Sequence, residues 1–164
     1  MPGVYMSNFA GGVMRPTPPD NHWVMSVPVP PTASFPVFDP DSDTGKFVKA
    51  MVLKRDQVLG KRILAATSYL TGNEILETFK KVYPVAGKTA SWNTLTSEQF
   101  KSNLINYAKM PDFAAQELLE NFLLFDQFGY FGGDKLDDSL AILEDKPTTW
   151  EEFLKTAPAT KDLK

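Results

Sequence analysis

The sequence predicts a single α/β domain, and three observations support that prediction. The chain has 164 residues, a length typical of one domain with a sizeable buried core. Hydrophobic residues make up 43% and charged residues 23%, as in ordinary globular proteins. From residue 56 onward, short apolar stretches alternate with amphipathic helical patterns. We therefore expect a few short strands with about five or six helices.

Composition excludes several classes of function. The net charge is −3 and no Lys/Arg cluster occurs, so direct contact with nucleic acid or an anionic membrane is not expected. The absence of cysteine excludes disulfides and thiolate metal sites. No apolar run approaches the ~20 residues of a membrane span, and the N-terminus has no signal-peptide pattern. We expect a cytoplasmic protein that does not associate with membranes.

Residues 15–40 contain most of the 13 prolines, which bars helix there. The aromatic and branched residues of this segment favour an ordered, wrapping loop over a disordered linker. Within the loop, residues 23–27 are the best strand, and residues 35–38 form a second extended piece.

Residues 39–55 read as a turn followed by an amphipathic helix around which the chain is organised. Asp43 or Thr44 is the expected helix cap. The apolar residues after it repeat with helical spacing and are expected to share one face; they are Phe47, Val48, Met51 and Val52.

The remaining elements follow from capping and breaking signals. We expect strands at residues 62–66 and 89–94. Ser/Thr-x-x-Glu/Gln capping boxes predict three helix starts, at Thr71 with Glu74, Thr96 with Gln99, and Thr148 with Glu151.

A longer helix is expected from Pro111 or Asp112 to about Phe128, where Gly129 stops it. Its second half, residues 118–128, is apolar over more than one face, and such helices are normally covered on several sides. We expect one face to join the core and another to meet a partner protein. The alternative is that the proline-rich loop covers the second face.

No complete catalytic or metal motif is present. Asp39, Asp41 and Asp43 alternate as in a calcium loop, but the glycine and the final acid of that motif are misplaced. The single histidine, His22, has no evident nucleophile or orienting acid. Neither a glycine-rich phosphate loop nor a Tyr-x-x-x-Lys dyad occurs, so we expect no catalysis from this chain alone.

Four segments, in order, resemble the C-terminal half of the NmrA-like family, whose members are atypical relatives of short-chain dehydrogenases. Residues 2–9 resemble its Pro-x-x-Tyr-x-x-Asn-Phe segment, and residues 43–48 resemble its Asp-x-Gly-x-x-Val helix start. Residues 60–65 with the following helix, and residues 148–154, resemble the next strand and helix and the terminal helix. The abrupt apolar start of the chain fits an absent N-terminal dinucleotide-binding half.

The resemblance implies a Rossmann-like fold that binds NADP or NAD when its N-terminal half is present. Family members act as redox sensors or transcriptional co-regulators, or look like reductases. A transcription factor is then a conceivable partner, and a nuclear location would fit. Because the phosphate loop is missing, we expect no cofactor for the isolated chain.

Site residues are also implied by the resemblance. The segment after the sixth strand of the family fold lies beside the nicotinamide. Tyr5, Met6 and Asn8, with the backbone of Gly3 and Val4, would contact the cofactor there. Phe9 and Trp23 are the expected substrate-pocket residues, and the alternative is that Tyr5 and Phe9 are core anchors.

Two hypotheses from different classes remain. The first is the substrate-side half of an NAD(P)-binding NmrA-like protein. The second is a stand-alone, non-catalytic protein-interaction module that docks a partner through the apolar helix and the proline-rich loop.

Overall fold

The computed structural model describes residues 1–17 and 22–163, and six short strands in these residues form two sheets. In the first sheet β4 (Ser34–Phe38) lies between β1 (Val4–Tyr5), its parallel neighbour, and β5 (Ser68–Thr71), its antiparallel neighbour. In the second, β3 (His22–Val27) pairs antiparallel with β2 (Met14–Thr17) and parallel with β6 (Ser91–Thr94). The strands expected at residues 23–27 and 35–38 are therefore present, and the proline-rich segment also supplies β2.

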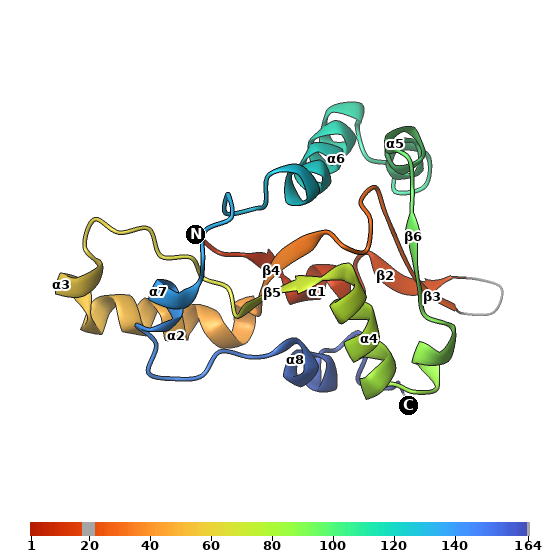
Figure 1. Cartoon of the computed structure of the whole chain (residues 1–164). Coiled ribbons are helices and arrows are strands. Elements are labelled where there is room, and N and C mark those ends of the chain that lie inside the picture. Colours follow the sequence, from red (N-terminus) through yellow and green to blue (C-terminus); the bar gives the residue numbers. More distant parts are fainter. Residues whose placement is uncertain (18–21, 164) are drawn as a thin grey trace.

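Helices cover both sides of the sheets. The longer ones are α2 (Pro40–Leu53), α4 (Gly72–Val82), α5 (Ser97–Asn106), α6 (Asp112–Gln127) and α8 (Trp150–Thr156). Single turns form α1 (Met6–Phe9), α3 (Arg55–Val58), α7 (Asp137–Leu140) and the 3-10 turn η1 (Ala86–Thr89). Helix α4 packs on α8 below the sheets, and α5 packs on α6 above them (Figure 1). The predicted α/β fold class is confirmed.

The main core lies between these helix pairs and is rich in aromatic side chains. Phe9, Phe35 and Phe79 are fully or almost fully buried. Phe9 meets Phe35 with ring centroids 5.3 Å apart, and Trp150 at 6.1 Å. This core fixes β1, α1 and β4 relative to the C-terminal helix α8.

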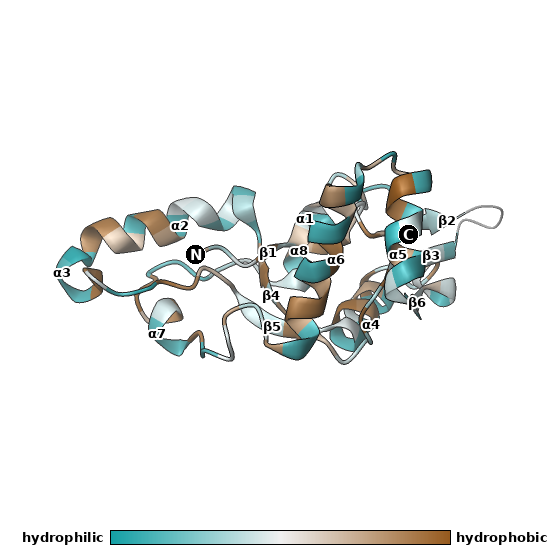
Figure 2. Ribbon diagram, turned by 90° about the horizontal axis from the view of Figure 1, so that it is seen from above, coloured by the Kyte–Doolittle hydropathy of each residue, from teal (hydrophilic) through white to brown (hydrophobic). Residues whose placement is uncertain are grey.

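At the other end of the molecule, α2 and α3 extend away from the main core beside α7, as both ribbon views show (Figures 1 and 2). Helix α2 buries Asp43, Phe47 and Ala50, which follow each other at helical spacing. Val48 and Val52 are 48% and 68% exposed, so the expectation that they share the buried face of Phe47 is wrong. They lie about 100° around the helix axis from Phe47 and Met51, respectively, on a side that the described chain leaves about half exposed or more.

The segment at residues 62–66 is extended but forms no strand of its own, which corrects the expectation there. It pairs with the N-terminal residues instead: Gly3 N donates to Ala65 O and Ala65 N donates to Met1 O, both at 2.8 Å. The pairing stays a single bridge between Pro2 and Ala65, because the next donor, the Thr67 N–H, bonds to the Val37 carbonyl of β4 at 2.8 Å. The strand β5 that follows was not predicted.

Capping signals located most helix starts. The boxes of Thr71 with Glu74 and of Thr96 with Gln99 are present. The last box is displaced by one residue, because Thr149 pairs with Glu152 while Thr148 bonds elsewhere.

The start of α2 also differs from the prediction. Asp39, and not Asp43 or Thr44, caps this helix by accepting from the backbone N–H groups of Asp41 and Ser42 at 3.1 and 3.4 Å. Pro40 occupies the first turn, where its fixed φ suits a helix start and its missing N–H costs nothing.

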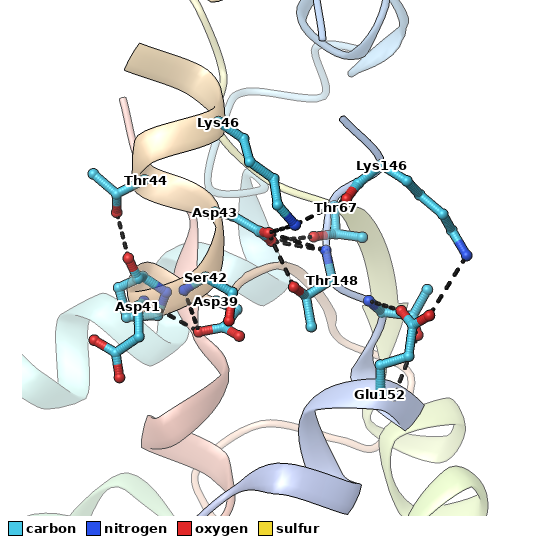
Figure 3. Close-up of polar contacts among 12 residues, drawn as sticks. Asp39, Asp41, Ser42, Asp43, Thr44, Lys46, Thr67, Lys146, Thr148 and Glu152 are labelled. Carbon is cyan, nitrogen blue, oxygen red and sulfur yellow. Dashed lines mark hydrogen bonds and ion pairs between the residues drawn. The ribbon is translucent and has the colours of Figure 1, made fainter. Parts of the chain in front are cut away.

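Asp43 is fully buried and joins α2 to the segment before α8 (Figure 3). Its carboxylate accepts from the Thr148 N–H at 3.0 Å and from the Thr148 hydroxyl at 3.0 Å. Lys46 Nζ lies 2.8 Å away and also donates to the Lys146 carbonyl at 2.9 Å. The aspartate read as a calcium-loop or cap candidate is thus a buried tie between two distant segments.

Candidate functional site

A cleft of about 530 Å³ opens between the N-terminal segment and α6. One wall comes from β1, α1 and the turn after them, namely Pro2, Gly3, Val4, Tyr5, Asn8, Phe9, Gly12 and Val13. The opposite wall is Leu118, Asn121, Phe122 and Phe125 of α6 with Tyr130, and Phe35 of β4 lines the cleft between the walls. Its volume is typical of sites for small organic ligands.

Close backbone packing shapes the N-terminal wall. A Cβ on Gly3 would lie 2.2 Å from the Pro36 carbonyl oxygen, so only glycine fits between β1 and β4 there. A Cβ on Gly12 would lie 2.2 Å from the Asn8 carbonyl oxygen, which accepts from the Val13 N–H at 2.8 Å. This tight turn folds residues 12–13 back beside Asn8.

Helical spacing shapes the opposite wall. Leu118, Asn121, Phe122 and Phe125 follow one another at i, i+3, i+4 and i+7, so one side of α6 faces the cleft. Gly129 ends the helix with a φ of +74°, a conformation that favours glycine. The chain then returns, and Tyr130 stacks on Phe125 with ring centroids 5.2 Å apart and an interplanar angle of 19°.

The cleft contains no ionisable group apart from tyrosine hydroxyls. Among the lining residues, Asn8 and Asn121 supply the only side-chain amides, and both are exposed. Asn121 Nδ2 donates to the Glu117 carbonyl at 3.0 Å. The described residues also hold no cluster of His, Cys, Asp or Glu that could bind a metal. Such a lining can bind and orient a ligand, but it offers no general acid or base of ordinary pKa near neutrality.

The structure brings together five of the predicted site residues. Gly3, Val4, Tyr5, Asn8 and Phe9 all line the cleft. Tyr5 is 40% exposed, whereas Phe9 is almost fully buried and contributes to both the core and the cleft.

Met6 and Trp23 lie elsewhere. Met6 is fully buried in the core and does not line the cleft. Trp23 lies on β3 in the second sheet, where its ring packs 5.2 Å from Phe79. Trp23 is a core residue and does not reach the cleft that the N-terminal segment forms.

The residues of the α6 wall, with Phe35 and Tyr130, were not predicted as part of the site. The sequence did carry one signal, since Leu118, Phe122 and Phe125 form a stripe of helical spacing. The pattern alone does not indicate which surface the stripe faces. That orientation depends on contacts between residues more than 80 positions apart in the sequence, such as Phe35 and Phe125, whose ring centroids are 5.0 Å apart.

Comparison with known families identifies the chain. The profile of the NmrA-like family matches residues 1–154. This chain belongs to the NmrA-like family. A search of curated protein sequences gives no significant match.

Solved structures share the fold. A nucleoside-diphosphate-sugar epimerase from Staphylococcus aureus is 16% identical, with a TM-score of 0.68 over 93% of this chain and 49% of that one. NmrA, a negative transcriptional regulator solved in complex with NAD, is 14% identical with a TM-score of 0.68, covering 95% of this chain and 50% of NmrA. NmrA has also been solved with NADP, at 15% identity and a TM-score of 0.68 over 95% of this chain and 50% of that one.

The chain therefore spans about half the length of the structures it matches. Among the described residues, no helix has the length and apolarity needed to cross a membrane.

Proposed function

We propose that this chain is the substrate-side half of an NAD(P)-binding NmrA-like protein and that its cleft receives the nicotinamide end of the dinucleotide. The observation that carries the proposal is the position of the cleft. It lies along the Pro-x-x-Tyr-x-x-Asn-Phe segment, and Gly3, Val4, Tyr5 and Asn8 all line it. The complexes of NmrA with NAD and with NADP support dinucleotide binding in the family.

The chain itself would hold only part of the dinucleotide. Binding of a pyrophosphate needs backbone N–H groups at a helix N-terminus, usually in a glycine-rich loop, and the sequence has no such loop. We therefore expect NADPH to bind this chain weakly, far from the low-micromolar affinity that corresponds to about −8 kcal/mol.

A titration with two parts of the cofactor tests the proposal. We expect nicotinamide riboside, which carries the nicotinamide without a phosphate, to shift the backbone NMR signals of residues 3–13, with a dissociation constant near 1 mM, equivalent to about −4 kcal/mol. ADP-ribose, which lacks the nicotinamide, should leave these signals unchanged. The proposal fails if nicotinamide riboside causes no shift.

Asn8 provides the matching variant. Its side chain is exposed and makes no hydrogen bond within the described residues, so Asn8→Ala should leave the melting temperature unchanged. Loss of one hydrogen bond to the ligand would weaken binding by ~0.5–1.5 kcal/mol. Asn103→Ala, at an exposed position of α5, is the control and should bind as the parent chain does.

A protein-interaction module is the second candidate, and the outer face of α6 favours it. Phe113 and Phe128 are 74% and 71% exposed, and Leu124 between them is 37% exposed. This face lies beside the cleft, and exposed aromatic groups of this kind favour association with a partner protein, a transcription factor among the conceivable ones.

The solution mass of the purified chain tests this second function. Concentration-dependent association that the double variant Phe113→Ser with Phe128→Ser abolishes would support it. A monomer that binds no hydrophobic dye would exclude it.

A further inference from the structure

We propose that the α6 end of the cleft binds an uncharged, planar aromatic ligand and rejects phosphorylated ones such as nucleotide sugars. This inference rests on the proposed function in one respect, since the nicotinamide is placed at the β1–α1 end of the same cleft. It adds the chemical class of the second ligand.

Ring geometry along the cleft supports an aromatic ligand. Phe9, Phe35, Phe125 and Tyr130 form a continuous row, with successive ring centroids 5.3, 5.0 and 5.2 Å apart. These spacings lie in the range that aromatic pairs prefer. Phe125 and Tyr130 are only partly buried, so their rings are accessible to a further ring placed in the cleft.

The absence of cations excludes phosphate. The residues that line the cleft include no Lys, Arg or His. Proteins hold phosphate groups with arginine forks, lysines or helix N-termini, and a charge buried without such partners is costly. The nearest helix N-terminus on this wall, that of α6, carries Asp112 in its first turn, which repels anions. Structural similarity to a nucleoside-diphosphate-sugar epimerase therefore does not extend to the charge of the ligand in this cleft.

Two amides define the polar edge of the ligand. Asn8 and Asn121 come from opposite walls and are exposed to the cleft opening. The bond from Asn121 Nδ2 to the Glu117 carbonyl uses one N–H, so its amide oxygen and second N–H remain to meet a ligand. A carbonyl or hydroxyl substituent on the ring system would match these groups.

A pair of aromatic probes, one uncharged and one phosphorylated, tests on the intact chain whether the cleft rejects phosphate. We expect 1-naphthol to bind with a submillimolar dissociation constant and to shift the NMR signals of Leu118, Asn121, Phe125 and Tyr130. The charged analogue 1-naphthyl phosphate should bind at least ~10-fold more weakly, and UDP-glucose should cause no shift. Equal or tighter binding of the phosphate would overturn the proposal, as would naphthol shifts confined to the outer face at Phe113 and Phe128.

A charge placed in the cleft should invert this selectivity. Leu118→Lys puts a cation on the α6 wall, where a long side chain can keep its head near the opening. We expect this variant to bind 1-naphthyl phosphate several-fold more tightly and 1-naphthol several-fold more weakly than the parent chain does. Leu124→Lys adds the same charge on the outer side of the same helix and should change neither constant. If both variants behave alike, the cleft is not the binding site.

Titrating 1-naphthol in the presence of nicotinamide riboside, which carries no phosphate, separates this inference from the proposed function. Binding of naphthol without binding of the riboside would support the aromatic site and contradict the proposed function. Binding of the riboside without binding of naphthol would support the proposed function and contradict the aromatic site. Simultaneous binding supports both, whereas strict competition would overturn the division of the cleft into two ends.

Discussion

Asp43 shows at the scale of one residue how a buried charge holds distant parts of this chain together. Its carboxylate is fully buried, yet two residues satisfy it, since the N–H and the hydroxyl of Thr148 donate hydrogen bonds and Lys46 supplies a cation. Buried carboxylates are tolerated only under such conditions. The aspartate therefore has a structural role, and the cleft lies elsewhere.

We expect Asp43→Ala to lower the free energy of unfolding by about 3 kcal/mol, because the part-buried Thr148 N–H and hydroxyl lose their acceptor and the Lys46 ammonium loses its carboxylate partner. Ser42→Ala, one residue away on the exposed side of α2, should stay within ~0.5 kcal/mol of the parent chain. Urea unfolding of the two variants measures the difference. Similar values for both would show that the tie contributes little.

Glu151 gives a prediction about pH. Hydrogen bonds from Lys155 and then Lys81 lower the pKa of its carboxyl from 4.5 to about 2. A pKa that is lower in the folded chain means stabilisation that is complete above about pH 4.5 and is lost as the pH falls toward 2. Unfolding by urea at several pH values should thus show a shallower acid decline for Glu151→Gln than for the parent chain. The control Glu117→Gln, on the outer side of α6, should keep the parent's slope.

At the scale of the element, α6 divides one apolar stripe between two environments. Leu119 is buried in the core, Phe122 is buried in the core and also lines the cleft, and Leu118 and Phe125 are partly buried and line the cleft. The outer side keeps Phe113 and Phe128 in solvent. The same helix thus serves the core, the cleft and an outer face, which explains why its sequence is apolar on more than one side.

Replacing glycine by alanine should have opposite effects on stability in a helix and in a tight turn of this chain. Gly45 lies inside α2, and a Cβ there would meet nothing within 4 Å, so Gly45→Ala should stabilise the chain by roughly 0.5–1 kcal/mol. Gly12→Ala should destabilise it by about 1–3 kcal/mol, because its Cβ would collide with the Asn8 carbonyl. The melting temperatures of the two variants test this prediction, which is wrong if both variants shift the melting temperature in the same direction.

At the scale of the whole molecule, local signals predicted elements well and their partners poorly. The capping boxes at Thr71 and Thr96 located α4 and α5 because each depends on four consecutive residues. The site was predictable only where the family motif ran along one segment, from Gly3 to Phe9. The second wall of the cleft was missed because it lies more than 100 residues further along the chain. Val52 was wrongly placed on a buried face because the sequence does not say which side of α2 packs against the rest of the chain.

The exposed side of α2 gives a whole-molecule prediction. Val52 and Leu53 are 68% and 60% exposed. Figure 2 shows that the end of α2 next to α3 is apolar in sequence. We expect the isolated chain to bind a hydrophobic dye there, and Val52→Lys with Leu53→Lys to reduce the dye signal with little change in melting temperature. Gln57→Lys with Gln127→Lys adds the same charge at polar positions and should keep the signal. If the α2 variant binds the dye as the parent chain does, the exposed apolar surface that binds the dye lies elsewhere.

The hydrogen bonds between Asp43 and Thr148 also affect when α2 can fold during synthesis of the chain. The two residues are separated by 105 positions. At ~5–20 residues per second, a ribosome adds Thr148 roughly 5–20 seconds after Asp43. During that interval the carboxylate has no Thr148 to accept from, so α2 cannot reach its final position early in synthesis. The α2 region of the nascent chain should therefore resist proteolysis only after Thr148 has been added.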